Sequence, residues 1–133
     1  MTKAIATMVG ILLLSHGGLG LFIEGEHLLG LFNVDIALDL TYLTLGALLV
    51  LVGETEVSAG LTRGVVVLGA LVMGGLGLLG LIDHHLFGLA PTGFELFDFL
   101  IFFGLAGALA LGALMPRPGA IMGEPHTGAV VRA

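Results

Sequence analysis

The sequence predicts an all-α integral membrane protein, a four-helix bundle built from two parallel helical-hairpin repeats. The first reason is composition: of 133 residues, 57% are hydrophobic and 11% are charged, whereas a soluble domain has about 25% charged residues. The second is a repeat with an offset of 58 residues, in which His-Leu-Leu-Gly-Leu at 27–31 returns as His-Leu-Phe-Gly-Leu at 85–89. Each repeat reads as an apolar helix, a polar turn and a second apolar helix.

Four apolar stretches are each close to the roughly 20 residues that cross a hydrocarbon core. We expect the first to be a membrane span, because its apolar run is longer than the roughly 7–15 residues of a signal peptide. Residues 1–115 then form the transmembrane domain, and the proline-containing residues 116–133 form a cytoplasmic tail. The expected spans are 3–23, 35–53, 63–82 and 94–115; the repeats are 3–53 and 63–112, and the polar loop is 54–62.

The basic residues predict the orientation. With four spans, the N-terminus, the central loop and the C-terminus lie on one side, and every basic residue falls there: Lys3, Arg63, Arg117 and Arg132. Because positive charge is retained on the cytoplasmic side, we expect a multi-pass protein of the cell membrane with both termini in the cytoplasm. The repeats are then parallel and related by an axis along the membrane normal.

Three stretches carry a resemblance to a known family: Gly30–Asp35, Arg63–Val66 and Gly88–Gly93. With the apolar helices around them, they resemble small four-helix prokaryotic membrane proteins grouped as a domain of unknown function. The resemblance covers residues 10–113 and implies the fold, without an activity. The chain departs from the family pattern at Asp39, Tyr42 and Phe102, where the resemblance implies more histidine and asparagine.

Composition and motifs exclude several classes of function. The chain has no cysteine, so disulfides and thiolate chemistry are excluded. Its net charge of −6 argues against nucleic-acid partners. The sequence shows no nucleophile–base arrangement and no phosphate loop, so we expect no enzyme.

The two outer loops carry imidazoles and carboxylates, the ligands that zinc, copper(II) or nickel take in proteins. A second interpretation is that these residues are solvated turns, and we expect no resident cofactor. Haem between His27 and His85 is a third, disfavoured because no outer arginine is available for its propionates. The candidate metal ligands are Glu26, His27, Asp83, His84 and His85.

Two acids fall about one turn inside the even-numbered spans, Asp39 and Asp98. A carboxylate in apolar surroundings is costly and marks a functional candidate. It either handles protons or cations, or makes interhelical hydrogen bonds, for example to Tyr42. Beside Asp98, Thr92 and Glu95 fit a capping box with Thr92 as the N-cap.

Small residues four apart predict close helix packing, most clearly Gly104, Ala108 and Gly112. His16, in the middle of the first span, is expected to be neutral and hydrogen-bonded to a neighbouring helix. The leading function is that of a structural or accessory subunit of a larger membrane assembly or homo-oligomer. Its partners are membrane lipids and other membrane subunits or copies of itself. The alternative is an ion, proton or divalent-metal binding or transport protein that uses the outer histidines and acids.

Overall fold

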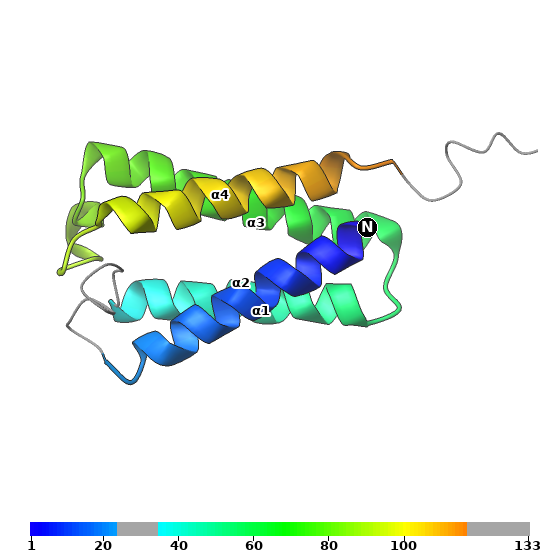
Figure 1. Ribbon diagram of the computed structural model, residues 1–133, viewed down its shortest axis with the longest axis horizontal. Coiled ribbons are helices and arrows are strands. Elements are labelled where there is room, and N and C mark those ends of the chain that lie inside the picture. The colour runs from blue at the N-terminus through cyan, green and yellow to red at the C-terminus, as the bar shows by residue number, and fades with distance from the viewer. Residues whose placement is uncertain (24–34, 117–133) are drawn as a thin grey trace, which may run out of the picture.

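The computed structural model describes residues 1–23 and 35–116, which contain four long α-helices and no strand. All four are long and apolar enough to cross a membrane, so the prediction of an all-helical chain with four such segments is confirmed. A 3-10 turn, η1, precedes the last of these helices (Figure 1). The helices are α1 (Thr2–Gly20), α2 (Ile36–Glu54), α3 (Ala59–Ile82) and α4 (Leu96–Leu114), and η1 is Leu86–Gly88.

The helices form two antiparallel hairpins, α1 with α2 and α3 with α4, which pack side by side (Figure 1). Further contacts join α1 to α4 and α2 to α3. One end of the bundle, here called the basic end, holds the start of α1, the α2–α3 connection and the end of α4. The opposite end, the acidic end, holds the start of α2 and the loop between α3 and α4.

Glycine allows α1 and α2 to approach closely. A Cβ added to Gly10 would lie 2.8 Å from the backbone oxygen of Gly46, and one added to Gly46 would lie 2.8 Å from that of Gly10. Further along, Gly17 faces the backbone oxygen of Asp39 at 2.7 Å. Since lipid tails supply no hydrophobic driving force between helices, such backbone proximity is a main source of packing energy in a membrane.

Aromatic rings fill the interface between α3 and α4. A Cβ on Gly77 would lie 2.8 Å from the ring of Phe103, and one on Gly80 would lie 2.5 Å from the ring of Phe94. Phe102 is fully buried, and its ring packs edge-on against that of Phe94 with 5.1 Å between the ring centroids. The phenylalanines that crowd the second half of the chain therefore occupy space that the first hairpin closes with backbone.

Burial repeats along the two hairpins with an offset of 60 residues. The bounds of α2 and α4 differ by 60 at both ends. The same offset relates buried residues of α1 and α3, namely Ala6 and Val66, Val9 and Gly69, Leu13 and Met73, Gly17 and Gly77, and Gly20 and Gly80.

The predicted offset of 58 residues does not align the helices. Leu13 is 1% exposed, whereas Leu71, its expected counterpart, is 68% exposed. Gly46 contacts Gly10, but a Cβ on its expected counterpart Gly104 would meet nothing within 4 Å. A shift of two residues turns a helix by about 200°, which exchanges its buried and exposed faces. The loop motif and the helices therefore follow different offsets.

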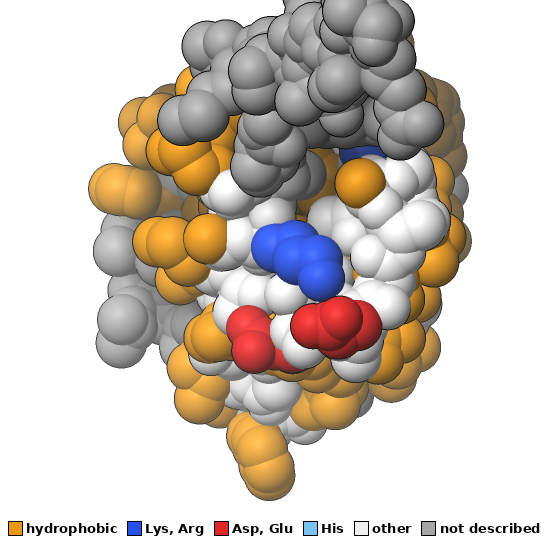
Figure 2. Space-filling model, turned by 90° about the vertical axis from the view of Figure 1, so that its right-hand side faces the viewer, with side chains coloured by type: hydrophobic (Ala, Val, Ile, Leu, Met, Phe, Trp, Pro, Cys, Tyr) orange, Lys and Arg blue, Asp and Glu red, His pale blue; other side chains and the backbone are white. Residues whose placement is uncertain are grey.

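Two equivalent hydrogen bonds close the hairpins at the basic end. Lys3 donates through Nζ to the backbone oxygen of Thr55 at 2.6 Å, and Arg63 donates through Nη2 to that of Met115 at 2.7 Å. Both pairs are related by the offset of 60, and both acceptors are C-caps, of α2 and α4. A cation there compensates the negative end of the helix dipole. Figure 2 shows basic and acidic side chains together on this end, with hydrophobic side chains around them.

Candidate functional site

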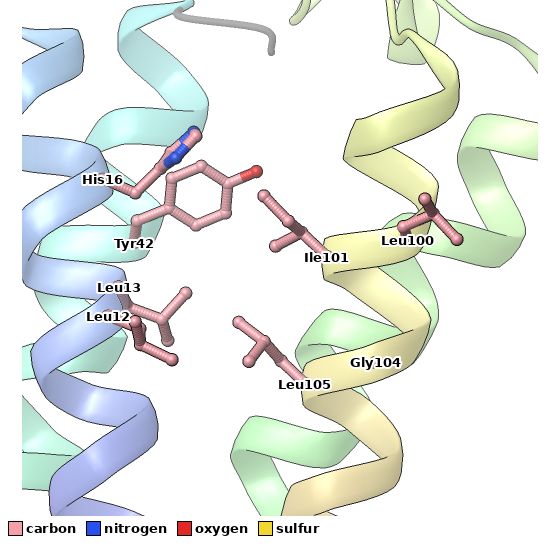
Figure 3. A pocket seen from close by; sticks show the side chains of 8 residues that line it. All are labelled: Leu12, Leu13, His16, Tyr42, Leu100, Ile101, Gly104 and Leu105. Atoms are coloured by element: carbon pink, nitrogen blue, oxygen red, sulfur yellow. The ribbon is translucent and has the colours of Figure 1, made fainter. Parts of the chain in front are cut away.

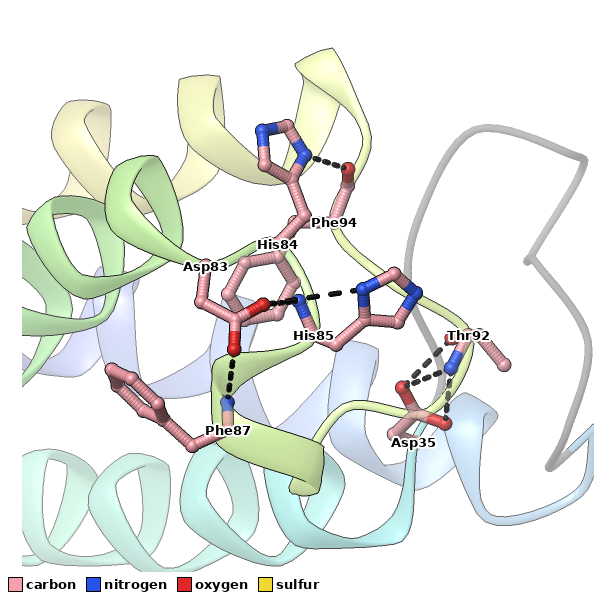
Figure 4. A network of polar contacts seen from close by, with 7 residues as sticks. All are labelled: Asp35, Asp83, His84, His85, Phe87, Thr92 and Phe94. Carbon is pink, nitrogen blue, oxygen red and sulfur yellow. Dashed lines mark hydrogen bonds and ion pairs between the residues drawn. The ribbon is translucent and has the colours of Figure 1, made fainter.

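The loop between α3 and α4 is organised by Asp83. Its carboxylate accepts backbone hydrogen bonds from His85 and Phe87, each at 2.9 Å (Figure 4). The bond from the His85 N–H, followed by that from Phe87, lowers the pKa of Asp83, because both favour the charged carboxylate. Phe87 has a positive φ of 57°, a conformation that costs energy in a bulky residue, so these bonds hold a strained turn.

His84 and His85 have different partners. Nδ1 of His84 lies 3.2 Å from the carbonyl oxygen of Phe94, so it donates there, and the ring packs against Phe99. Nδ1 of His85 lies 4.0 Å from Oδ1 of Asp83, and its ring lies beside Gly93. Figure 4 shows the two rings on different sides of the loop. The loop by itself thus presents two separated imidazoles.

The structure describes only some of the predicted metal ligands. Asp83, His84 and His85 are described, whereas Glu26 and His27 lie outside the described residues. Among residues 1–23 and 35–116, no three histidine or acidic side chains are grouped as a metal site would require. The predicted ligand set therefore includes two residues, Glu26 and His27, whose positions the structure does not describe.

A hydrogen-bonded pair that the sequence analysis did not find ties the hairpins together at the acidic end. Asp35, the N-cap of α2, accepts from the hydroxyl of Thr92 at 2.8 Å and from its backbone N–H at 3.1 Å (Figure 4). Asp35 is 5% exposed, so these charge-assisted bonds are largely shielded from water. They fix the start of α2 against the segment that leads into α4.

The predicted capping box with Thr92 as N-cap is wrong by three residues. Helix α4 has Glu95 as its N-cap and Asp98 at N3, and the backbone N–H of Glu95 donates to Oδ2 of Asp98 at 2.7 Å. The helix begins later because Thr92 is held by Asp35 and because Gly93 has a φ of +79°, which is not helical.

The two acids singled out in the sequence are both buried. Asp98 is 1% exposed, and its capping of Glu95 accounts for an acid at this depth. Asp39 is 0% exposed and lies against α1, where a Cβ on Gly20 would collide with its carboxylate. A glycine at position 20 therefore makes the space that Asp39 occupies.

Tyr42 lies one turn further along α2, and the sequence analysis considered it as a hydrogen-bond partner of the buried acids but not as part of a binding site. It is 1% exposed, and its ring meets that of His16 edge-on at 5.1 Å and that of Phe102 at 6.5 Å. The rings of Tyr42 and His16 line a cavity of about 210 Å³ between α1, α2 and α4 (Figure 3). The available signal was that this is the single tyrosine of the chain. The other lining residues are Leu12, Leu13, Leu100, Ile101, Gly104 and Leu105.

The predicted packing ridge of α4 divides between two surfaces. A Cβ on Gly112 would lie 3.1 Å from Ile5 of α1, and Ala108 is half-buried. A Cβ added to Gly104, by contrast, would meet nothing within 4 Å. Four residues turn a helix by about 400°, so two such steps rotate the ridge by about 80°. Among the residues that the structure describes, the Gly112 end of this ridge is packed closely and the Gly104 end is not.

The open part of α4 is a different stripe, made by Leu100, Gly104, Gly107 and Leu111 and here called the α4 outer face. Leu100 and Leu111 are 59% and 65% exposed, and Gly107, like Gly104, has nothing within 4 Å of an added Cβ. Spacings of four, three and four residues keep these positions on one side of a helix. The face is therefore a shallow notch between two leucines.

Comparison of the chain with protein-family models, with curated proteins and with solved structures gives no match. A function is therefore inferred from the geometry described above.

Proposed function

We propose that this chain is a small multi-pass membrane protein that acts as a structural or accessory subunit, packing against another membrane-embedded chain through the α4 outer face. The observation that carries the proposal is the pairing of two open glycines on one side of α4. Gly10, Gly17, Gly46 and Gly77 each allow a contact with another described segment, whereas Gly104 and Gly107 meet none and lie on one face between exposed leucines. Open glycines elsewhere, at Gly18, Gly64 and Gly75, are not paired in this way.

Helix packing in lipid makes this contrast informative. A glycine inside a helix costs roughly 0.5–1 kcal/mol relative to alanine, and the cost is offset where a second backbone comes close. At Gly104 and Gly107 none of the helices that the structure describes does so. A partner helix seated between Leu100 and Leu111 would supply the missing contact. The partner is either another subunit or a second copy.

We also propose an orientation of the protein in the membrane and an origin of its fold by tandem duplication. Lys3 and Arg63 lie at the basic end, which the positive-inside rule places in the cytoplasm; Arg117 and Arg132 lie outside the described residues. A tandem duplication with an offset of 60 residues is supported by the equal spacing of helix bounds and of buried residues. The outer histidines then face the opposite side of the membrane.

Purification from native membranes tests the packing proposal. Tagged wild-type protein is expected to migrate on a native gel as an assembly larger than one chain, and Gly107→Leu to migrate as a smaller species. Gly64→Leu is the matched control, because Gly64 is exposed on α3 and its added Cβ also meets nothing. A wild-type protein that migrates as a single chain would contradict the proposal.

The alternative, proton or ion handling, is supported by one observation. Asp39 is a fully buried carboxylate inside a helix long and apolar enough to cross a membrane, and buried acids in such helices often take part in proton or ion transfer. Asp98 supports it less, because its capping bond explains its position. Ion or proton flux into vesicles that contain the protein, abolished by Asp39→Asn, would favour this alternative.

A further inference from the structure

We propose that the cavity between α1, α2 and α4 binds a lipid-soluble quinone, with the hydroxyl of Tyr42 donating a hydrogen bond to a ring carbonyl. This inference does not rest on the subunit proposal, although the cavity shares Leu100 and Gly104 with the α4 outer face. It begins with the polar group that the cavity contains.

The side chain of Tyr42 is 1% exposed, and within residues 1–23 and 35–116 no hydrogen bond from its hydroxyl is observed. It points into the space between α2 and α4, towards Ile101 (Figure 3). Tyrosine hydroxyls in apolar surroundings usually have a hydrogen-bond partner. A hydrogen-bond acceptor inside the cavity would supply one.

The remaining wall of the cavity defines the rest of the ligand. Its other lining residues, apart from His16 and Gly104, are leucines and one isoleucine. The ligand must therefore be apolar around its acceptor. The ring of His16 stands edge-on to Tyr42, so a second ring beside them would lie among aromatic groups.

The size of the cavity favours a single ring. A cavity of about 150 Å³ accommodates benzene, so about 210 Å³ accommodates a six-membered ring with carbonyl oxygens. A phospholipid is much larger. Leu12 and Leu100, which are 57% and 59% exposed, lie where the cavity reaches the outer surface of the helices. The apolar tail of a quinone would leave there into the lipid.

The composition of the chain provides a direct optical test. The protein has one tyrosine and no tryptophan, so its tyrosine fluorescence, excited at wavelengths that phenylalanine does not absorb, comes from Tyr42 alone. We expect a benzoquinone with a decyl chain, added to the full-length protein in detergent, to quench this fluorescence with a saturable dependence on concentration. Quenching that rises linearly without saturation would show collisions only and would overturn the proposal.

Two variants separate a bound ring from a general effect. Ile101→Phe places a ring in front of the Tyr42 hydroxyl and is expected to abolish saturable quenching. Leu114→Phe is the same kind of change at an exposed position of α4 outside the cavity, and it is expected to behave as the wild type. Equal quenching in both variants would contradict a site at the cavity. Helical circular dichroism confirms that each variant is folded.

The role of the hydroxyl is tested by Tyr42→Phe, with binding of the decyl quinone measured by its retention on the immobilised protein. Loss of one hydrogen bond is expected to weaken binding about tenfold, while retention of decylbenzene, which has no carbonyl, stays unchanged. An unchanged affinity for the quinone would overturn the assignment. Displacement of the quinone by dioleoylglycerol at equal concentration would assign the cavity to a lipid ester instead and would also contradict it.

Discussion

Gly10 of α1 and Gly46 of α2 are in reciprocal backbone contact, each placed so that a Cβ would fall 2.8 Å from the backbone oxygen of the other. This contact joins the first hairpin without polar groups, as membrane helices often do. Its counterpart in the second hairpin, at the offset of 60, is Ala70 with Ala106. The first hairpin is therefore closed by backbone and the second by side chains.

Enlarging Gly46 is expected to separate α1 from α2. Gly46→Leu adds a side chain where backbone already fills the space, and we expect it to destabilise the protein by at least about 1–3 kcal/mol. Thermal unfolding in detergent measures the effect. Gly18→Leu on α1 is the control, because nothing lies within 4 Å of a Cβ there. Equal stability of the two variants would show that the contact contributes nothing.

The Asp35–Thr92 pair is expected to stabilise the acidic end. Thr92→Val keeps the backbone bond to Asp35 but removes the hydroxyl that donates at 2.8 Å, and it should destabilise the protein by about 1 kcal/mol. Thr44→Val, at an exposed position of α2, is the matched control and should change the stability little. If chemical denaturation gives the same free energy of unfolding for both, the pair has no structural role.

The loop after α3 is expected to respond to acid. The folded pKa of Asp83 is below its ordinary value of about 3.9, so its carboxylate stabilises the loop above that pH. The contribution is lost as the pH falls through the folded pKa. Lowering the pH from about 6 to about 2 should shift the amide resonances of His85 and Phe87 with a midpoint below the ordinary value. In Asp83→Asn this transition should be absent; its persistence would assign the titration to another group.

The space at Gly20 is expected to be specific for glycine because of Asp39. Gly20→Ala places a methyl group against the Asp39 carboxylate and should lower the melting temperature. The double variant Gly20→Ala with Asp39→Ala should recover part of this loss of stability, since the second substitution removes the carboxylate that the new methyl group would meet. A double variant no more stable than Gly20→Ala would show that Asp39 is not the cause.

The existence and length of the helices could be predicted from the sequence, because apolar stretches of about 20 residues determine them. The expected spans 35–53 and 63–82 differ by a few residues from α2 and α3. The offset of 58 follows the five-residue motif beginning at His27, whereas the buried faces of the helices follow an offset of 60. Those faces are visible only once α1 is packed against its neighbours.

The candidate site was less predictable because its contacts are distant in sequence. Nothing local to Thr92 indicates that Asp35 binds it, and that bond displaced the expected start of α4. Likewise, Tyr42 is indistinguishable in the sequence from the apolar residues around it on α2. Its place at a cavity follows only from the position of α4 opposite it. The burial of Asp39 and Asp98 was expected from the cost of a charge in lipid, but the capping role of Asp98 depended on where α4 begins.

The most direct test of the subunit proposal uses the absence of cysteine in this chain. Gly107→Cys, on the α4 outer face, and Leu71→Cys, 68% exposed on α3, are each expressed in native membranes, labelled with a maleimide that carries a benzophenone, and illuminated so that the benzophenone reacts with nearby C–H bonds. We expect a crosslinked product with a second chain from Gly107→Cys and none from Leu71→Cys. Gly107→Cys protein that stays uncrosslinked, or that gives the same products as Leu71→Cys, would contradict the account.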